Sequence, residues 1–384
     1  MSHVRAVHDF VEKNIEAVLD DLDRLVSLET PSSDRRLLDR FLREFEPFVE
    51  QRLGTPAKRQ LHNGGDRGDV LDLTWEGSPG VEGTLLSVCH YDTVWPEGTL
   101  ADWPLTRKGD VLTGPGVLDM KAGIVQTIWM VTALRELAIP HPAIRLLLTG
   151  DEEIGSTASR QHIEDAASES LLTLIAEPSA GGDIKVQRKG TVMADITVQG
   201  VESHAGLDPE KGASAIHELA RLVGRVADLA DPEKGTTINV GIINGGSGRN
   251  VVAGTARCEV DVRIQDADEE DRVVAELEDL SPYDSRCTVT TEIDRNRPPM
   301  NPSERVNELV AVVEAIGNEL GSTISTKPVG GASDGNFIAA LGLPVIDGLG
   351  GIGAGPHARH EHITVSGLPR QTAVMAGLAA HLTK

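Results

Sequence analysis

Two side chains that can bind metal ions come directly after an apolar segment of the chain. Residues 84–93 read TLLSVCHYDT, an apolar run of strand length followed by His90 and Asp92. Because residues i and i+2 of an extended segment point the same way, His90 and Asp92 can converge at the carboxyl end of a strand, where open α/β sheets bind ligands. A hydrogen-bonded histidine beside a turn aspartate is the structural alternative, and it fits this stretch equally well.

Further carboxylates and histidines follow other apolar segments. They are Asp119 in the Gly-Pro turn of residues 114–123 (GPGVLDMKAG), Asp151, Glu152 and Glu153 in residues 149–155 (TGDEEIG), Glu177 in Ala176-Glu177-Pro178, and His357, His360, Glu361 and His362 in the glycine-rich residues 348–362. Three adjacent carboxylates repel one another unless they are protonated, solvated or neutralised by a cation. An N-cap for Asp119 and a solvated turn for residues 151–153 are structural alternatives. The recurrence at strand ends favours a metal site across one sheet edge.

The spacing of apolar residues predicts the elements that must position these side chains. Apolar residues three and four apart predict one long amphipathic helix over residues 7–26, ending before Pro31, and another over residues 37–49. Strands are predicted at residues 69–75, 84–90 and 143–148, with a helix at residues 121–137 and a further apolar run at residues 171–175. This alternation predicts an α/β fold with a parallel or mixed sheet.

A different pattern over residues 189–297 predicts an inserted domain. Strands are expected at residues 191–199, 236–243, 253–264 and 286–293 and helices at residues 212–229 and 268–280, in the βαββαβ order of ferredoxin-like domains. A helix at residues 303–320 then returns the chain to the first domain, which comprises residues 1–188 and 298–384. A four-stranded sheet with helices on one side leaves an exposed edge, and pairing with a second copy would protect that edge.

Composition limits the function classes. A chain of 384 residues predicts two domains at roughly 100 to 200 residues each, and its net charge of −23 disfavours nucleic acid and anionic membranes, which need a basic face. The charged N-terminal residues lack the apolar core of a secretory signal, and no uncharged apolar run approaches the roughly 18 residues of a membrane span. Three widely spaced cysteines, Cys89, Cys258 and Cys287, predict buried thiols without disulfides and a cytoplasmic location.

Taken in order, the motifs resemble those of one family of metal-dependent hydrolases. The order is His90-x-Asp92, Gly116-x-x-Asp119-Met120-Lys121-x-Gly123, Asp151-Glu152-Glu153-x-Gly155, Glu177-Pro178 and His357 before Glu361. It resembles the di-zinc exopeptidase and deacylase family of glutamate carboxypeptidase, acetylornithine deacetylase and succinyl-diaminopimelate desuccinylase, most closely the glutamate carboxypeptidase branch. The resemblance implies a mixed-sheet metal-binding domain with an inserted dimerisation domain, and two zinc ions per chain, with cobalt or manganese as other metals.

The resemblance also implies a ligand set. His90 and Glu177 bind one zinc ion, Glu153 and His357 bind the other, and Asp119 bridges the two. Imidazole and carboxylate groups suit zinc. His357 is preferred over His360 and His362 because it stands four residues before Glu361, as the family's histidine does.

Three residues are expected to act in catalysis. Glu152 resembles the general base that assists attack by a hydroxide bridging the two metal ions and then protonates the leaving amine. Asp92 resembles the partner that fixes the tautomer of His90. His204 in Ser203-His204-Ala205-Gly206 resembles the histidine that reaches the active site of the other subunit in a homodimer and stabilises the oxyanion. Taken alone, a histidine in a turn is more typical of plain surface.

Asn250, Arg263 and Arg297 occupy positions resembling those that hold the terminal carboxylate of the substrate. The planar fork of arginine suits this task, and an exposed structural charge is the alternative for Arg263. The chain departs from the family where Val251-Val252 follows Asn250 in place of Ile-Pro, and Arg249 adds an unexplained charge. Residues 330–334 (GGASD) resemble a turn that lines the cleft, and they also fit a helix start capped by Ser333 or Asp334.

The expected function is therefore a cytoplasmic zinc-dependent hydrolase that cleaves an amide bond next to a free carboxylate, similar to glutamate carboxypeptidase. Its substrate would be a small peptide or an N-acyl-amino acid, and a homodimer is the expected assembly. An N-acyl-amino-acid deacylase of the aminoacylase or acetylornithine deacetylase type is the first alternative. A non-catalytic binding or scaffold protein with the same fold is the second.

Overall fold

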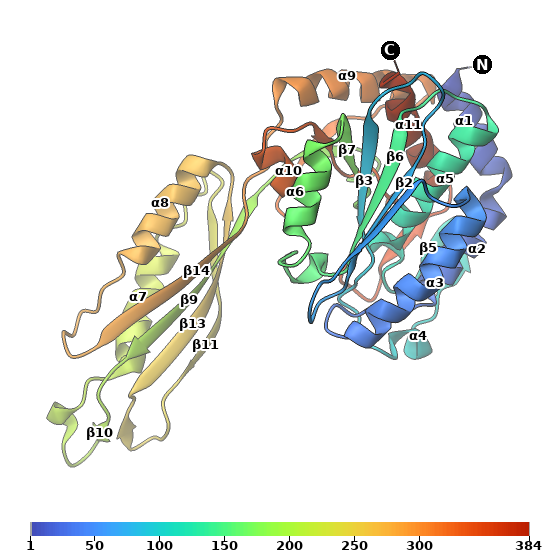
Figure 1. Cartoon of the computed structure of the whole chain (residues 1–384). Helices are drawn as coiled ribbons and strands as arrows, with labels where there is room; N and C mark the ends of the chain where they lie inside the picture. Colours follow the sequence, from blue (N-terminus) through green and yellow to red (C-terminus); the bar gives the residue numbers. More distant parts are fainter. Residues whose placement is uncertain (1, 384) are drawn as a thin grey trace. The chain divides into compact units, whose positions relative to one another are not determined.

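The computed structural model describes residues 2–383 and divides the chain into two compact units (Figure 1). The first unit contains the described residues up to Gln187 together with Pro302–Pro328 and the described residues from Ser333 onward. The second contains Arg188–Asn301 and the short segment Val329–Ala332. The inserted domain predicted at residues 189–297 lies within the second unit, and Val329–Ala332 is an addition to it.

A six-stranded mixed sheet forms the centre of the first unit. Its strand order is β1-β2-β6-β3-β7-β16, and the bounds are Lys58–His62, Val70–Trp75, Ala143–Thr149, Thr84–His90, Leu172–Ile175 and Val345–Ile346. The strands β6, β3, β7 and β16 are parallel to one another, whereas β2 is antiparallel to β6 and β1 is antiparallel to β2. The predicted mixed sheet is thus confirmed, and its antiparallel edge is the part that the sequence did not specify.

The strand β3 lies between β6 and β7, so its side chains are covered on both faces. Every residue from Leu85 to His90 is buried, which explains the near-continuous apolar run. Because β3 is parallel to both neighbours, the three strands present their carboxyl ends at one edge of the sheet. The segments that follow Thr149 and Ile175 therefore meet the segment that follows β3.

Helices cover both faces of this sheet. In Figure 1, α6 lies on one side, and α3, α5 and α11 lie on the other. The bounds of the longer helices are α1 His3–Lys13, α2 Ile15–Val26, α3 Arg35–Leu53, α5 Ala122–Glu136, α6 Arg160–Ser168, α9 Glu304–Glu319, α10 Gly335–Ala340 and α11 Gly367–His381. The segment Val117–Glu136 is apolar and long enough to cross a membrane, but 89% of its apolar window is buried inside the unit, as in the core helix of a globular domain.

The single helix predicted over residues 7–26 is wrong, because the chain breaks at Asn14. Asn14 has φ −102° and ψ 18°, and its side-chain amide donates to the carbonyl of Phe10 at 2.8 Å. Asparagine competes for backbone groups in this way and so ends helices. The apolar spacing continues across the break into α2, which is why periodicity alone did not reveal it.

Short elements complete the first unit. They are α4 Thr99–Asp102, β4 Thr106–Lys108, β5 Val111–Thr113, a π-helical turn Val117–Lys121, a 3-10 turn Glu152–Ile154, β8 Ile184–Arg188, β15 Thr326–Val329, β17 Gly353–Ala354 and β18 His362–Thr364. The strands β17, β18, β5 and β4 form a small antiparallel sheet. None of these short strands was predicted from the sequence, because each is too short for its pattern to be read.

The second unit has the predicted βαββαβ order. Its four-stranded antiparallel sheet has the order β11-β13-β9-β14, and two helices, α7 and α8, lie on one face of it (Figure 1). The bounds are β9 Gly190–Gln199, α7 Ala215–Ala227, β11 Thr237–Gly245, β13 Thr255–Ile264, α8 Ala267–Glu278 and β14 Thr288–Arg297, with a 3-10 turn Pro209–Lys211 and a two-stranded ladder of β10 Ser203–His204 and β12 Val251–Val252. This order of strands is that of ferredoxin-like domains.

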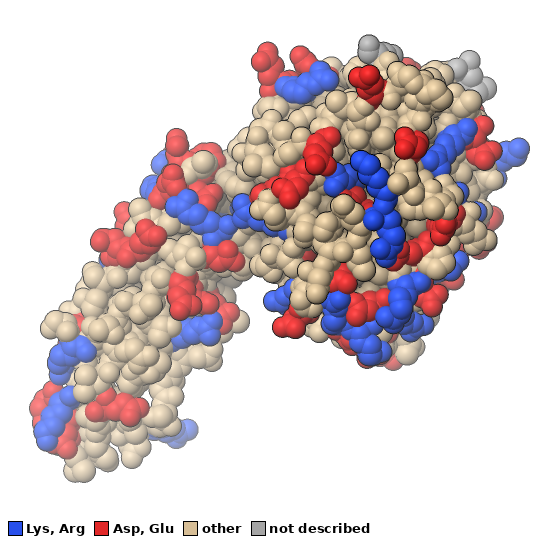
Figure 2. Space-filling model, viewed as in Figure 1, with Lys and Arg blue, Asp and Glu red and all other residues tan. Residues whose placement is uncertain are grey.

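Each unit has its own apolar core. The core of the second unit includes Val192, Leu219, Val260 and Leu277 and is separate from the core of the first. Cys89, Cys258 and Cys287 are buried free thiols, as predicted. On the face shown in Figure 2, acidic and basic side chains are interspersed.

Candidate metal centre

The predicted ligands His90, Glu153 and Glu177 lie together at the carboxyl edge of the central sheet. His90 is the last residue of β3, Glu153 lies in the short turn after β6, and Glu177 follows β7. His90, Asp119 and Glu153 have ligand atoms within 4.8 Å of one another, and so do His90, Glu152 and Glu177. The parallel arrangement of the three strands therefore brings together residues that are far apart in the sequence.

Asp119 joins this group from a turn that is not helical. Its φ of −114° and ψ of 96° are extended, and α5 begins only at Ala122 with Lys121 before it. Asp119 is therefore not the N-cap of α5, which was the structural alternative. The preceding Gly116 has φ +68°, a left-handed conformation that glycine adopts readily and that turns the chain back toward the sheet edge.

The two carboxylate oxygens of Asp119 face two different histidines. Oδ1 lies 3.1 Å from Nε2 of His90, and Oδ2 lies 3.5 Å from Nε2 of His357. Nε2 of His90 is also 3.4 Å from Oε1 of Glu177, and Nε2 of His357 is 3.0 Å from Oε2 of Glu153. The donors thus form two groups that share Asp119, in the pairing that the family resemblance implied.

The chemistry of these donors fits metal cations. Nδ1 of His90 lies 3.0 Å from the carbonyl oxygen of Asp92, which can only accept, so Nδ1 carries the proton in the neutral ring. The lone pair of Nε2 then faces carboxylate oxygens, which also carry lone pairs, and a proton or a cation must lie between them. In the described part of the chain, Asp119 and Glu153 form side-chain ion pairs only with histidines, and Oε1 of Glu153 is buried without a hydrogen-bond donor.

The pKa shifts of these groups have the same origin. Burial raises the pKa of Glu153 to about 7, and contacts with Asp119 and Glu153 raise the pKa of His357 to about 10. Burial alone would lower the pKa of His90, but hydrogen bonds to Asp119, Asp92 and Glu177 raise it well above its ordinary value. A cation bound near neutral pH would therefore displace protons from this site.

Asp92 orients both the histidine and the two glutamates. Its backbone carbonyl accepts from His90, whereas its carboxylate stands 3.5 Å from the same ring nitrogen. The buried carboxylate instead accepts the backbone N–H groups of Glu152 and Glu153, each at 3.2 Å, and the hydroxyl of Ser32 at 2.7 Å. The tautomer of His90 is thus fixed mainly by the main chain of Asp92, and its side chain positions the residues after β6.

Of the three histidines in residues 348–362, only His357 contacts the proposed ligands. It lies between β17 and β18 with φ +61°, which is strained for a residue other than glycine. His362 lies in β18, and its Nδ1 lies 2.9 Å from the backbone carbonyl of His360. The choice of His357 from its spacing to Glu361 agrees with this geometry.

Sequence reasoning did not assign a structural role to Glu361. Its side chain is fully buried and accepts hydrogen bonds from the backbone of Gly116, Leu118 and Asp119 and from the indole of Trp95. Nothing in its local sequence predicts burial, since Glu361 stands between two histidines in a polar loop. The only sequence signal for Glu361 is that it stands four residues after His357, as in the family that the motifs resemble.

The remaining predicted residues lie in the second unit. His204 and Asn250 are brought together, because β10 pairs with β12 and the N–H of Ala205 donates to the carbonyl of Asn250 at 2.8 Å. Arg263 and Arg297 are also brought together, on either side of Thr191 in the register of the sheet. These two pairs lie at opposite ends of β9, which at about 3.3 Å per residue spans roughly 26 Å between Thr191 and Gln199.

Arg263 already has a carboxylate partner within its own strand. Its Nε and Nη2 donate to the two oxygens of Asp261, each at 2.8 Å, and Nη1 donates to the hydroxyl of Thr191 at 2.8 Å. The pair is partly exposed, with 34% of the Arg263 side chain and 40% of the Asp261 side chain accessible. A substrate carboxylate would have to compete with Asp261 for this fork.

Residues 330–334 form a helix start. The hydroxyl of Ser333 accepts the N–H of Gly335, the first residue of α10, at 3.1 Å and donates to Asp347 at 2.5 Å. Asp334 makes no side-chain cap to this helix. Of the two capping residues considered from the sequence, Ser333 is therefore the one that contacts the helix end.

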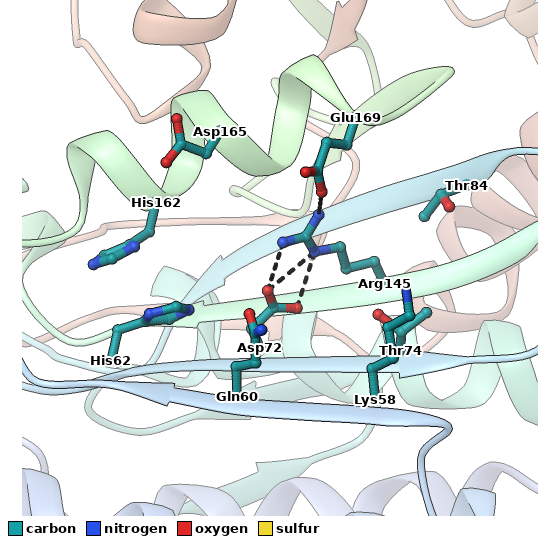
Figure 3. Close-up of a pocket in the computed structure, with 10 residues that line it drawn as sticks. All are labelled: Lys58, Gln60, His62, Asp72, Thr74, Thr84, Arg145, His162, Asp165 and Glu169. Atoms are coloured by element: carbon teal, nitrogen blue, oxygen red, sulfur yellow. Dashed lines mark hydrogen bonds and ion pairs between the residues drawn. The ribbon is translucent and has the colours of Figure 1, made fainter.

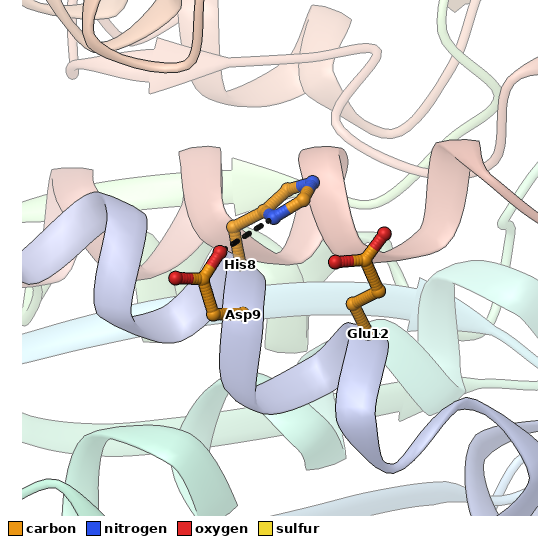
Figure 4. Close-up of side chains that lie close together, drawn as sticks. All are labelled: His8, Asp9 and Glu12. Atoms are coloured by element: carbon orange, nitrogen blue, oxygen red, sulfur yellow. Dashed lines mark hydrogen bonds and ion pairs between the residues drawn. The ribbon is translucent and has the colours of Figure 1, made fainter.

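Two other groups of polar side chains lie in the first unit. A cavity of about 510 Å³ over β1, β2 and β6 is lined by polar residues, and its floor is the ion pair of Arg145 with Asp72 and Glu169 (Figure 3). His8, Asp9 and Glu12 lie close together on α1, where Asp9 and Glu12 are exposed (Figure 4). In the first group Arg145 already pairs with two carboxylates, and the second group comes from one helix surface, so neither matches the buried donors around Asp119.

Comparison with known proteins agrees with the family resemblance of the sequence motifs. Residues 86–381 match peptidase family M20/M25/M40. Carboxypeptidase G2 of Pseudomonas sp. (strain RS-16) is 30% identical over 373 residues, which cover 95% of this chain and 89% of that protein. Acetylornithine deacetylase of Myxococcus xanthus is 28% identical over 312 residues, covering 76% of this chain and 77% of that protein. A tripeptidase structure from Staphylococcus aureus has a TM-score of 0.83 at 20% identity, covering 96% and 99% of the two chains, and so shares the fold.

Proposed function

The chain belongs to peptidase family M20/M25/M40, and from this premise we propose that it is a di-zinc hydrolase that cleaves an amide bond next to a free carboxylate, as a glutamate carboxypeptidase does. That it is a metal-dependent enzyme hydrolysing peptide or amide bonds follows from the family. The observation that carries the finer proposal is Asp119, whose two oxygens face His90 and His357. A shared carboxylate of this kind suits two adjacent cations.

Five residues would hold the two ions. His90, Glu177 and Asp119 form one set of donors, and His357, Glu153 and Asp119 form the other. Two zinc ions, when bound, would lower the pKa of bound water, so that hydroxide is available near neutral pH to attack a carbonyl group. Nitrogen and oxygen donors also suit cobalt and manganese, so the metal in the cell depends on supply as well as on the ligands.

Glu152 is the proposed general base. Its backbone N–H is held by Asp92, and its carboxylate lies within 4.8 Å of ligand atoms of His90 and Glu177. The neighbouring Glu153 is turned toward His357 instead. Glu152 would take a proton from the attacking water and deliver it to the leaving nitrogen, which requires a carboxylate beside the metal site that is not itself a ligand.

The substrate carboxylate is proposed to bind to residues of the second unit. Arg263 and Arg297 flank Thr191 in the sheet, and their guanidinium groups suit a carboxylate. Asn250 lies with His204 beyond the other end of β9, so a single chain does not supply all four residues to one carboxylate. We therefore assign Arg263 and Arg297 to one substrate site of a homodimer, and His204 and Asn250 to the site of the other subunit.

His204 has the hydrogen-bonding state that an oxyanion requires. Its Nδ1 accepts the backbone N–H groups of Gly206 and Leu207, each at 3.1 Å. The proton of the neutral ring then resides on Nε2, which remains available as a donor. This supports a role for His204 in stabilising the negative charge of a tetrahedral intermediate.

An exposed edge of the second unit supports the proposed homodimer. The outer strand β11 pairs only with β13 in its sheet, and its residues Ile242 and Ile243 are 49% and 58% exposed. Unpaired edges of this kind are commonly covered by another chain. The buried free thiols agree with a reducing compartment, which supports the proposed cytoplasmic location.

A deacylase is the second candidate function. The similarity to acetylornithine deacetylase favours it, and the same metal ligands and carboxylate site would serve a substrate with a different acyl group. A scaffold role is not favoured, because every proposed ligand and Glu152 are present and lie close together. The second candidate differs from the first only in what lies on the acyl side of the bond.

A substrate panel tests the proposal. Zinc-loaded protein would be assayed against peptides with a C-terminal glutamate, N-acetyl- and N-succinyl-amino acids, and the same compounds with the carboxylate converted to an amide. We expect hydrolysis of the carboxylate compounds, fastest for the C-terminal glutamate series. Faster hydrolysis of the N-acyl-amino acids would favour the deacylase, and equal hydrolysis of the amidated compounds would contradict both.

A further inference from the structure

Glu361 connects the two turns that carry Asp119 and His357. Its carboxylate is completely buried and accepts four N–H groups. Oε1 accepts from Leu118 at 2.9 Å and Asp119 at 3.1 Å, and Oε2 accepts from Gly116 at 3.1 Å and the indole of Trp95 at 2.9 Å. Three of the four donors therefore belong to the backbone of the turn that presents Asp119.

The main chain of Glu361 also ends the turn that carries His357. Its N–H donates to the carbonyl of Ala358 at 2.8 Å, and the N–H of Ala358 donates to Gly355 at 3.0 Å. Its carbonyl accepts the N–H of Gly114 at 3.3 Å, on the same turn as Asp119. The side chain of Glu361 therefore binds the turn that carries Asp119, and its backbone binds both that turn and the turn that carries His357.

This position matters because both turns are locally strained or irregular. His357 has φ +61°, and Asp119 has extended backbone angles inside a helical turn. Such conformations persist only where the surrounding structure holds them. The carboxylate of Glu361 supplies acceptors for N–H groups at the start of the turn of residues 117–121, where a helix provides no acceptor of its own.

We propose that Glu361 is a positioning residue that sets the distance between Asp119 and His357 and thereby forms the metal subsite of Asp119, Glu153 and His357. The inference rests on the proposed two-ion centre, and it concerns the affinity of that centre in the absence of substrate. Outer partners of metal ligands commonly change metal affinity by roughly 10- to 100-fold when they are removed. Glu361 acts here through backbone groups, at a distance from the ions themselves.

Glutamine at this position distinguishes the role of the carboxylate from that of side-chain volume. In Glu361→Gln one oxygen becomes an NH₂ group, which faces two N–H donors that it cannot accept. Either the pair Leu118 and Asp119 or the pair Gly116 and Trp95 loses its acceptor. Both outcomes release part of the turn that carries Asp119 while keeping a side chain of nearly the same size.

The chain offers a matched control in the second unit. Glu218 is also buried, and its carboxylate accepts the backbone N–H groups of Tyr283 at 2.5 Å and Asp284 at 3.2 Å. Glu218→Gln therefore makes the same chemical change in the same kind of environment, away from the metal ligands. Trp95→Phe is a second control, because it removes one donor to Glu361 and leaves the three backbone donors in place.

The experiment measures zinc affinity by competition with a chromophoric chelator at 25 °C, and the melting temperature of the metal-free proteins. We expect Glu361→Gln to weaken binding of at least one zinc ion by roughly 10- to 100-fold. Glu218→Gln should lower the melting temperature yet leave both zinc affinities within about twofold, and Trp95→Phe should also retain them. If Glu361→Gln does not fold, Glu361→Asp is measured instead, since it keeps the charge but withdraws the carboxylate from its donors.

Unchanged zinc affinity in the folded Glu361 variant would overturn the inference, and so would an equal loss of affinity in Glu218→Gln. Absence of zinc binding by the unmodified protein would instead overturn the proposed function. The two failures are therefore distinguishable in one set of measurements.

Discussion

At the residue scale, one aspartate holds the two adjacent glutamates for which we propose different tasks. The carboxylate of Asp92 accepts the backbone N–H groups of Glu152 and Glu153, and its carbonyl oxygen contacts His90. Asp92 therefore links the positions of the two glutamates to that of His90. The carboxylate of Glu153 contacts His357, whereas that of Glu152 belongs to the group of His90 and Glu177. Neighbours in sequence can thus serve as ligand and base, because the short turn after β6 directs them to different parts of the centre.

Replacing each glutamate separately tests this division. Glu152→Gln is expected to retain bound zinc and to lower kcat by roughly 10²- to 10⁴-fold, the usual contribution of general acid–base catalysis. Glu153→Gln is expected to reduce zinc content, because it removes a ligand. Metal analysis after dialysis and steady-state kinetics would measure both effects, and a Glu152 variant with unchanged kcat would remove Glu152 from the mechanism.

Asp261 is expected to control access of the substrate carboxylate to Arg263. Because the Asp261–Arg263 pair is partly exposed, its removal is worth only about 0.2 to 1 kcal/mol, which corresponds to a change of a few-fold at most. Asp261→Asn should therefore lower KM for carboxylate substrates by roughly two- to fivefold. Amidated analogues provide the control, since they should not respond. An identical response of both substrate types would exclude Arg263 from the carboxylate site.

At the scale of elements, predictions from the sequence succeeded where a pattern was long. The sequence predicted the strand that ends at His90, the core helix before Leu137 and the βαββαβ order. In these elements the pattern of apolar residues continues over seven or more residues. The break at Asn14 and the ladder of β10 with β12 were missed, since one polar residue or two paired residues leave no periodic signal.

That the proposed metal ligands lie close together was predictable from the sequence for a different reason. His90, Glu153 and Glu177 each follow an apolar strand, so parallel pairing alone brings them together. The family resemblance assigned all five ligands, and the positions of His357 and Asp119 depend in addition on turns held by long-range hydrogen bonds. The contact from Glu361 to Leu118 spans 243 residues, and no local pattern encodes such a contact.

A pH effect is expected in the second unit, where Glu269 links α8 to the start of β11. Its buried carboxylate accepts from Arg272 at 2.8 Å, Lys234 at 2.6 Å and Thr236 at 2.9 Å. The hydrogen bonds from Arg272, and then those from Lys234 and Thr236, outweigh the effect of burial and lower the pKa of Glu269 to about 2. A lowered pKa gives stability that is present above the unfolded-state value of about 4.3 and is lost as pH falls toward 2.

Glu269→Gln should accordingly destabilise the protein at pH 7 by about 1 kcal/mol, a modest value because Arg272 and Lys234 are partly exposed. The difference from the unmodified protein should shrink as pH falls from about 4.3 to about 2, the window set by the two pKa values. Urea unfolding followed by circular dichroism at several pH values would measure it. A difference that grows as pH falls would show that the sign of the linkage is wrong.

At the scale of the whole molecule, we propose that each active site takes residues from two chains. Arg263 and Arg297 lie at one end of β9, and His204 and Asn250 lie beyond the other. A symmetric dimer would place the second pair of one copy at the substrate site of the other, and each site would then be completed by its partner. The sequence indicated these residues singly, and only the register of the sheet shows that they are separated.

Subunit mixing tests this arrangement. His204→Ala and Glu152→Gln homodimers should each be nearly inactive, but a mixture that exchanges subunits should recover about one quarter of the original activity. Half of the dimers are then mixed, and each mixed dimer has one site with both residues intact. No recovery after demonstrated exchange would mean that His204 acts within its own chain.

The most direct test of the central claim is a zinc titration of metal-free protein. The shared position of Asp119 between His90 and His357 predicts that the unmodified chain binds two zinc ions and that hydrolysis appears as both sites fill. Saturation at two ions per chain, measured by calorimetry alongside activity, is the result that we expect. Saturation at one ion with full activity, or activity that persists after both ions are removed, would contradict the account.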